Sequence, residues 1–147
     1  MSYQEKKTIT IILTTIAFTA GYFFRVNQIY IERGSDVDPL TFWSGVILLM
    51  VPLGILSHIA TQILLAAVYK IQTGESPPSK DDERDKLIEL KTLRVSYYLF
   101  MLGFFTSLAL GLRGSSLTTV FLTLIVSMIG SGLIGEITRY FLYRKQS

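Results

Sequence analysis

The chain has 147 residues, half of them hydrophobic, and a mean hydropathy of +0.44. It contains no cysteine and a single histidine, His58, which excludes disulfides, thiol catalysis and a multi-histidine metal site within one chain. The net charge of +3 does not indicate nucleic-acid binding, because the basic residues flank long apolar runs. Runs of about twenty apolar residues are long enough to cross a bilayer. The sequence therefore predicts an all-α, polytopic transmembrane four-helix bundle that forms one domain over residues 1–147.

Four apolar segments are predicted to span the membrane. They cover about residues 8–31, 40–69, 95–112 and 117–143. The second segment is long enough to tilt and contains Pro52. Lys6 and Lys7 precede the first segment like the basic region of a signal peptide. The apolar run after them is longer than in a signal peptide and lacks a small-residue cleavage site, so we expect it to remain as a span.

The connector between the second and third spans, residues 70–94, is the only long polar stretch. Its central part holds five of the eleven acids of the chain. Ser79, with Asp82 three residues later, is a variant of the capping box that begins helices. We expect one continuous helix over about residues 80–112, whose first half is a cytoplasmic helical stalk extending the third span.

The charges of this stalk have two interpretations. The first is the solvated start of a helix, where acids favour the helix dipole. The second is a docking face for a cytoplasmic protein partner or a divalent ion, and the lack of a glycine turn and of regularly spaced oxygen ligands argues against the ion. The candidate partner-binding residues are Asp82, Glu83, Arg84 and Asp85.

The distribution of Lys and Arg predicts the orientation of the spans. Eleven of these residues lie on the side of the two termini and the connector, and three lie on the other side: Arg25, Arg33 and Arg113. Because basic residues are retained on the cytoplasmic side, we expect both termini and the connector in the cytoplasm.

The two halves of the chain are weakly similar. Gly21-Tyr22-Phe23 in the first span corresponds to Gly103-Phe104-Phe105 in the third. Two repeated helical hairpins related by an axis along the membrane normal would give this pattern, and chance similarity between apolar helices would give it too.

Small residues recur every fourth position on the third and fourth spans. The candidate helix-packing residues are Gly103, Ser107, Gly111, Ser127, Ser131 and Gly135. Small residues let helix backbones approach closely in lipid. They fit either tight packing of these two spans within one chain or a homodimer interface. Since four thin helices bury few side chains, we expect a homo-oligomer.

Polar groups inside the spans are the candidate functional site, because a charged group at the centre of a span costs about 2.5–3.5 kcal/mol on insertion scales. His58 is predicted near the midplane, and Glu136 nearer the inner boundary with Arg139 three residues on. Each has a structural alternative: a hydrogen-bonded neutral histidine, a local ion pair, or an arginine that extends to the interface. The candidate intramembrane residues are His58, Gln62, Thr61, Glu136, Arg139 and Arg25.

The polar run from Asp82 to Lys91, followed by Arg94-Val95-Ser96-Tyr97-Tyr98, resembles a motif of small prokaryotic integral membrane proteins of unknown function, the DUF2178-like group. The ending, Glu136 through Arg139 to Tyr143-Arg144, is similar to the C-terminus of that group. The resemblance implies four spans and a bacterial or archaeal plasma (inner) membrane. It supplies no catalytic or binding residues.

Several chemistries have no motif in this sequence: a phosphate-cradling glycine loop, HExxH, and paired histidines. We therefore expect no enzyme activity, no cofactor and no metal. The first hypothesis is permeation or transport of an ion or small solute through the intramembrane polar cluster. The alternative is a membrane-anchored sensor or regulatory interaction protein that acts through the stalk. A third is a structural bundle whose basic inner face binds anionic lipid of the bilayer.

Overall fold

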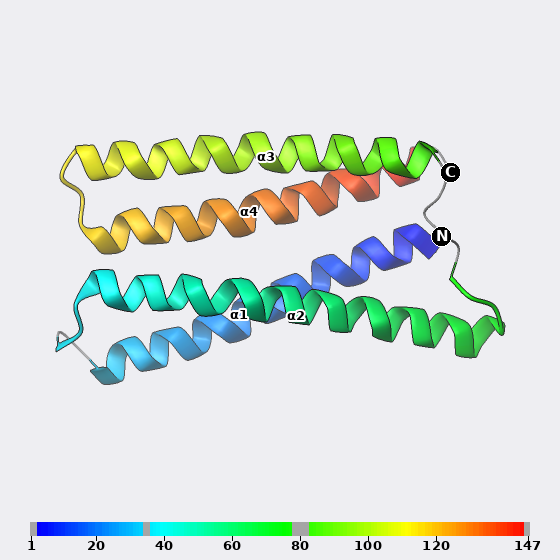
Figure 1. The fold of residues 1–147 in the computed structure, drawn as a ribbon, viewed down its shortest axis with the longest axis horizontal. Coiled ribbons are helices and arrows are strands. Elements are labelled where there is room, and N and C mark those ends of the chain that lie inside the picture. The colour runs from blue at the N-terminus through cyan, green and yellow to red at the C-terminus, as the bar shows by residue number, and fades with distance from the viewer. Residues whose placement is uncertain (1–2, 34–35, 78–82, 146–147) are drawn as a thin grey trace.

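The structure is a computed structural model that describes residues 3–33, 36–77 and 83–145. These residues form four helices, α1 (Tyr3–Arg33), α2 (Pro39–Thr73), α3 (Glu83–Leu112) and α4 (Leu117–Arg144), which run up and down the long axis (Figure 1). All four are long and apolar enough to cross a membrane. The prediction of an all-α protein with four helices that could span a membrane is confirmed for the described residues.

The helices are longer than the predicted spans. α1 begins at Tyr3 and α2 continues to Thr73, so both helices extend past the predicted apolar segments. α3 is continuous from Glu83, as expected for a helix that starts in the connector. The capping residues Ser79 and Asp82 lie outside the described residues. The cytoplasmic location of the first half of α3 stays a prediction.

Local chemistry accounts for both ends of α2. The Asp38 carboxylate accepts hydrogen bonds from the Thr41 backbone N–H at 2.9 Å and from the Thr41 hydroxyl at 3.0 Å, and Pro39 follows as the first helical residue. Gly74 ends the helix with a φ of 72°, the left-handed conformation that glycine adopts without a steric penalty.

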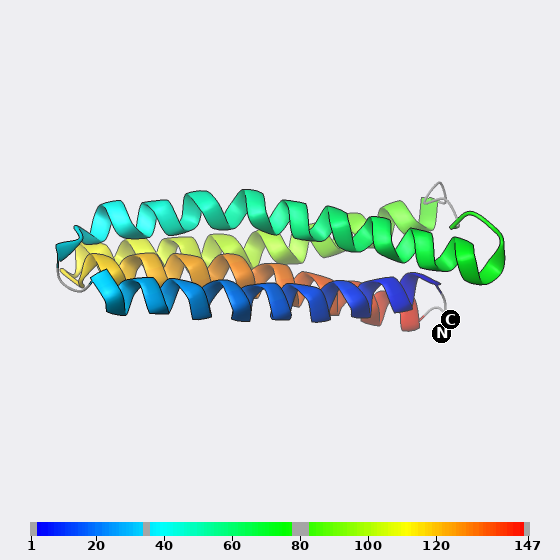
Figure 2. The same ribbon diagram turned by 90° about the horizontal axis from the view of Figure 1, so that it is seen from below.

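α4 is the central helix of the bundle. Within the described residues, α3 packs against α4 alone, whereas α1 and α2 contact each other and α4. Figure 1 shows α3 and α4 side by side and α1 crossing α2, and Figure 2 shows the same molecule turned by 90°. The bundle is therefore a close pair, α3 and α4, with α1 and α2 on another side of α4.

Small residues bring α3 and α4 together. A Cβ on Gly103 would collide with the Ser127 side chain, and one on Gly135 would collide with Ser96 Oγ. The buried Ser107 hydroxyl donates to the Val120 carbonyl at 2.7 Å. Such close approach is how helices associate in lipid.

The other small residues are in less crowded places. A Cβ on Gly111 would lie 3.7 Å from Val120. Ser131 is buried and donates to Met128 O of its own helix. All these contacts are made within one chain, and the homo-oligomer stays a prediction. Gly21, the counterpart of Gly103 in the proposed repeat, would have nothing within 4 Å of a Cβ.

Aromatic residues join α1, α2 and α4 at the end that carries the α1–α2 loop. The buried cluster there consists of Val26, Trp43, Val46, Met50 and Ile125. The Tyr22 hydroxyl donates to the Val46 carbonyl at 2.6 Å, and Trp43 Nε1 donates to Thr118 Oγ1 at 3.2 Å. These side chains fix the spacing of the three helices.

The α3–α4 contact predicts the effect of adding one methyl group. Gly103→Ala should destabilise the protein by about 1–3 kcal/mol, the usual range for overpacking, because the new Cβ meets Ser127. The matched control is Gly130→Ala on α4, where a Cβ has nothing within 4 Å. Thermal unfolding in detergent measures both. An unchanged midpoint for Gly103→Ala would contradict this close approach.

The cap of α2 predicts a dependence of stability on pH. The Thr41 backbone N–H, followed by the Thr41 hydroxyl, holds the pKa of Asp38 below its ordinary value of 3.8. A carboxyl whose pKa is lower in the folded state stabilises the protein above the unfolded pKa, and this stabilisation is lost as the pH falls through the folded value.

When the pH is lowered below the ordinary pKa range of Asp, the unfolding midpoint of the wild type should therefore fall by more than the midpoint of Asp38→Asn, because Asn keeps a good cap without the charge. Asp36→Asn, in the same loop, serves as the control. Parallel pH profiles for wild type and Asp38→Asn would argue against the capping contribution.

Candidate functional site

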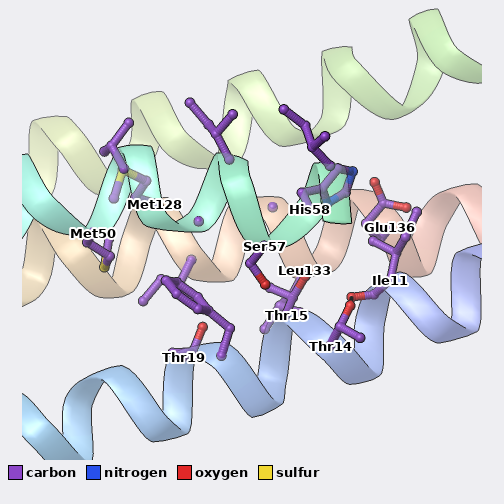
Figure 3. Close-up of a pocket in the computed structure, with 17 residues that line it drawn as sticks. Ile11, Thr14, Thr15, Thr19, Met50, Ser57, His58, Met128, Leu133 and Glu136 are labelled. Atoms are coloured by element: carbon purple, nitrogen blue, oxygen red, sulfur yellow. Dashed lines mark hydrogen bonds between the residues drawn. The ribbon is translucent and has the colours of Figure 1, made fainter. Parts of the chain in front are cut away.

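A cavity of about 500 Å³ lies between α1, α2 and α4. α3 contributes no residue to its wall. Gly54 of α2 and Gly132 of α4 line it; the Phe18 ring packs against Gly54, whereas a Cβ added to Gly132 would have nothing within 4 Å. Its polar lining residues are Thr14, Thr15, Thr19, Ser57, His58 and Glu136. Figure 3 shows these side chains converging from three helices.

The cavity brings together two of the predicted site residues. His58 of α2 and Glu136 of α4 are 78 positions apart in the sequence, and both line it. Figure 3 draws their side chains at the same end of the cavity. His58 is half-buried, and its imidazole makes no hydrogen bond to any residue that the structure describes. Its polar atoms are therefore available to a ligand or to water.

Glu136 is paired with Arg139 of the next turn. Arg139 Nη1 donates to both carboxylate oxygens, at 2.8 Å and 3.1 Å. The side chains of Arg139 and Glu136 are 20% and 16% exposed, so the pair is largely shielded. Glu136 lines the cavity and Arg139 does not. Of the two paired residues, the acid, Glu136, is therefore the one that faces the cavity.

Three hydroxyls in the wall have free hydrogen-bonding capacity. In apolar helices, Ser and Thr hydroxyls commonly donate to a carbonyl three or four residues earlier, as Thr14 does to Thr10 O. The hydroxyls of Thr15, Thr19 and Ser57 form no hydrogen bond with any described residue. A polar group without a partner in an apolar setting is costly, so a polar occupant of the cavity would relieve this cost.

The sequence alone did not single out two of these hydroxyls, those of Thr15 and Thr19. Thr15 and Thr19 are four residues apart and so share a face of α1. The spacing alone could have indicated a polar stripe, but it does not tell whether a hydroxyl bonds to its own helix.

The other predicted intramembrane residues lie elsewhere. Neither Thr61 nor Gln62 lines the cavity. Thr61 is buried and donates to the Ser57 carbonyl at 2.8 Å. Arg25 is exposed, does not line the cavity, and donates to Gln28 Oε1 at 3.1 Å.

Part of the predicted stalk packs against α4. Asp82 lies outside the described residues, and Glu83 and Arg84 are exposed. Asp85 is half-buried and forms a side-chain hydrogen bond with Tyr143 of α4, which is itself buried. Asp85 is thus engaged within the chain, whereas Glu83 is at the surface.

No cluster of three or more His, Cys, Asp or Glu side chains that could hold a metal ion occurs among residues 3–33, 36–77 and 83–145. Comparisons with protein-family models, curated proteins and solved structures found no match. The resemblance to the DUF2178-like group therefore stays a prediction.

The ion pair predicts an asymmetric response to substitution. Arg139→Gln leaves the Glu136 carboxylate without its partner and should destabilise the protein by on the order of 2 kcal/mol, less than for a fully buried pair because both groups are partly exposed. Glu136→Gln should cost less, since the long Arg139 side chain can extend toward water.

Chemical or thermal unfolding in detergent measures both substitutions, with Arg144→Gln, at an exposed position on the same helix, as the control. The double variant, Glu136→Gln with Arg139→Gln, should recover part of the stability that Arg139→Gln alone loses. Equal, additive losses from the two single variants would mean that the pair contributes nothing to stability.

Proposed function

We propose that the chain carries an ion or a small solute across the membrane and binds it in the cavity between α1, α2 and α4. One observation supports this above the others: one cavity within apolar helices holds the Glu136 carboxylate together with an imidazole and three hydroxyls, and neither the imidazole nor the hydroxyls have a hydrogen-bond partner among the described residues. Intramembrane polar groups are unfavourable without partners, and they commonly mark solute paths. A bundle that served only as an anchor would gain nothing from such hydroxyls.

Contacts join helices of the bundle on both sides of the cavity. Toward the α1–α2 loop, Tyr22 and Trp43 hold α1, α2 and α4 together. Toward the other end, the Tyr3 and Tyr69 rings meet edge-to-face at 4.7 Å, and Ile11 is buried. Passage of a solute along the bundle therefore requires these contacts to open in turn, as in alternating access.

The proposal includes a setting for this activity. We place the protein in a prokaryotic plasma membrane, with both termini and the start of α3 in the cytoplasm. The distribution of Lys and Arg supports the orientation. The resemblance of the polar segment to the DUF2178-like group supports the membrane type.

A flux measurement in proteoliposomes tests the transport proposal. Current and internal pH are recorded after a pH jump, and uptake of labelled solutes is followed in parallel. We expect His58→Ala and Glu136→Gln to lower the flux by roughly tenfold or more, because the first removes the imidazole and the second removes the carboxylate charge from the cavity wall.

Gln62→Ala is the matched control, since Gln62 lies one turn from His58 and does not line the cavity. It should retain the flux of the wild type. Folded cavity variants that transport as fast as the wild type would contradict the proposal.

A second candidate function is a membrane-anchored interaction protein that acts through the start of α3. The supporting observation is the contact of Asp85 with Tyr143, which links the polar segment to the helix that carries Glu136. A pull-down from membranes, with wild type beside Glu83→Lys, tests it. Recovery of the same proteins with both baits would contradict a specific role for this surface.

A further inference from the structure

The cavity has an opening toward the surroundings of the bundle at mid-length. Val51, Ile55 and Ile59 line it along one side of α2, and they are 43%, 56% and 48% exposed. Gly132, on the facing helix α4, is exposed as well, and a Cβ added there would have nothing within 4 Å. In a membrane this rim faces the acyl chains. A solute can therefore enter from the bilayer without passing along the axis of the bundle.

Most of the wall is apolar, which favours a solute with an apolar body. Phe18, Met50, Ile129 and Leu133 line the cavity together with the rim residues. A volume of about 500 Å³ suits a small organic molecule and exceeds what a bare ion needs. The body of the solute would replace contacts with lipid by contacts with these side chains.

The polar groups favour a solute whose polar end donates hydrogen bonds. The Glu136 carboxylate can only accept, and the hydroxyls of Thr15 and Ser57 can accept as well. An ammonium group has donors and no acceptor, so it matches these partners. A carboxylate would instead lie beside Glu136 and be repelled by it.

The position of Arg139 leaves Glu136 accessible to such a donor. A single guanidinium nitrogen bridges the two carboxylate oxygens from outside the cavity. Arginine on a helix can extend toward the membrane interface and keep its charge hydrated. An ammonium group inside the cavity can therefore take its place at Glu136.

We infer that the cavity binds a lipophilic amine, which enters laterally from the bilayer and places its ammonium group at Glu136 while Arg139 moves outward. This deepens the proposed function, because it names the class of solute that the same cavity takes. Transport of the amine rests on the proposed function. Binding of the amine does not, because binding is an equilibrium property of the site.

Equilibrium binding to the purified full chain in nanodiscs tests the inference, with empty nanodiscs as the baseline. The probes are adamantanamine, adamantanol and adamantane carboxylate, which share one apolar body and differ in the polar end. We expect the amine to bind more tightly than either analogue. Glu136→Gln should weaken amine binding by about 10–100-fold, the loss typical of one charge-assisted hydrogen bond.

Thr15→Val should weaken binding of the amine several-fold. Thr10→Val on the same helix is the control, because Thr10 bonds to Lys6 O and does not line the cavity. Glu136→Asp should restore part of the binding lost in Glu136→Gln. The comparison of the three probes on the wild type stays decisive even where a variant fails to fold.

The inference is overturned if the amine does not bind, if the alcohol or the carboxylate binds as tightly, or if folded Glu136→Gln retains the wild-type affinity. Amine binding without flux would contradict only the transport proposal. Flux of another solute without amine binding would contradict only the assignment of the amine.

Discussion

The close approach of α3 and α4 is the contact on which the arrangement of the other helices depends. Gly103 lies against Ser127, and Gly135 against Ser96, so the two backbones come together where any larger side chain would separate them. In lipid, helices gain nothing from hiding apolar surface, and complementary packing decides which pairs form. Because α3 occupies one side of α4 and contacts no other helix among the described residues, α1 and α2 pack on the remaining surface of α4.

The cavity follows from how the side chains between α1, α2 and α4 change in size along these helices. At the end with the α1–α2 loop, bulky side chains such as Trp43 and Tyr22 fill the space and hold the helices apart. In the middle, Gly132 supplies no side chain to fill the same spacing, and a Cβ added there would have nothing within 4 Å. The wall of the cavity carries the hydroxyls of Thr15, Thr19 and Ser57 and the imidazole of His58. None of these groups has a hydrogen-bond partner in the described chain. One set of spacings therefore produces both the packed end and the polar cavity in which we propose that the solute binds.

The sequence predicts what depends on local patterns and misses what depends on helix crossings. Four spans follow from apolar runs, and the Glu136–Arg139 pair follows from a spacing of three residues on one helix. The meeting of His58 with Glu136 depends on how α2 crosses α4, which no local pattern encodes. Thr61 and Gln62 share a helix face with His58, yet they lie about 5 Å further along the axis, past the end of the cavity.

The most direct test of this account is thiol cross-linking in native membranes, since the chain has no cysteine of its own. Thr15→Cys is combined with Ser57→Cys to join α1 and α2 across the cavity, and Ser57→Cys with Thr106→Cys to join α2 and α3. A short membrane-permeant bifunctional reagent should link the first pair and leave the second pair unlinked, because α2 and α3 make no contact in the described chain. Efficient linking of the second pair, with none of the first, would show that the three helices do not enclose a common cavity.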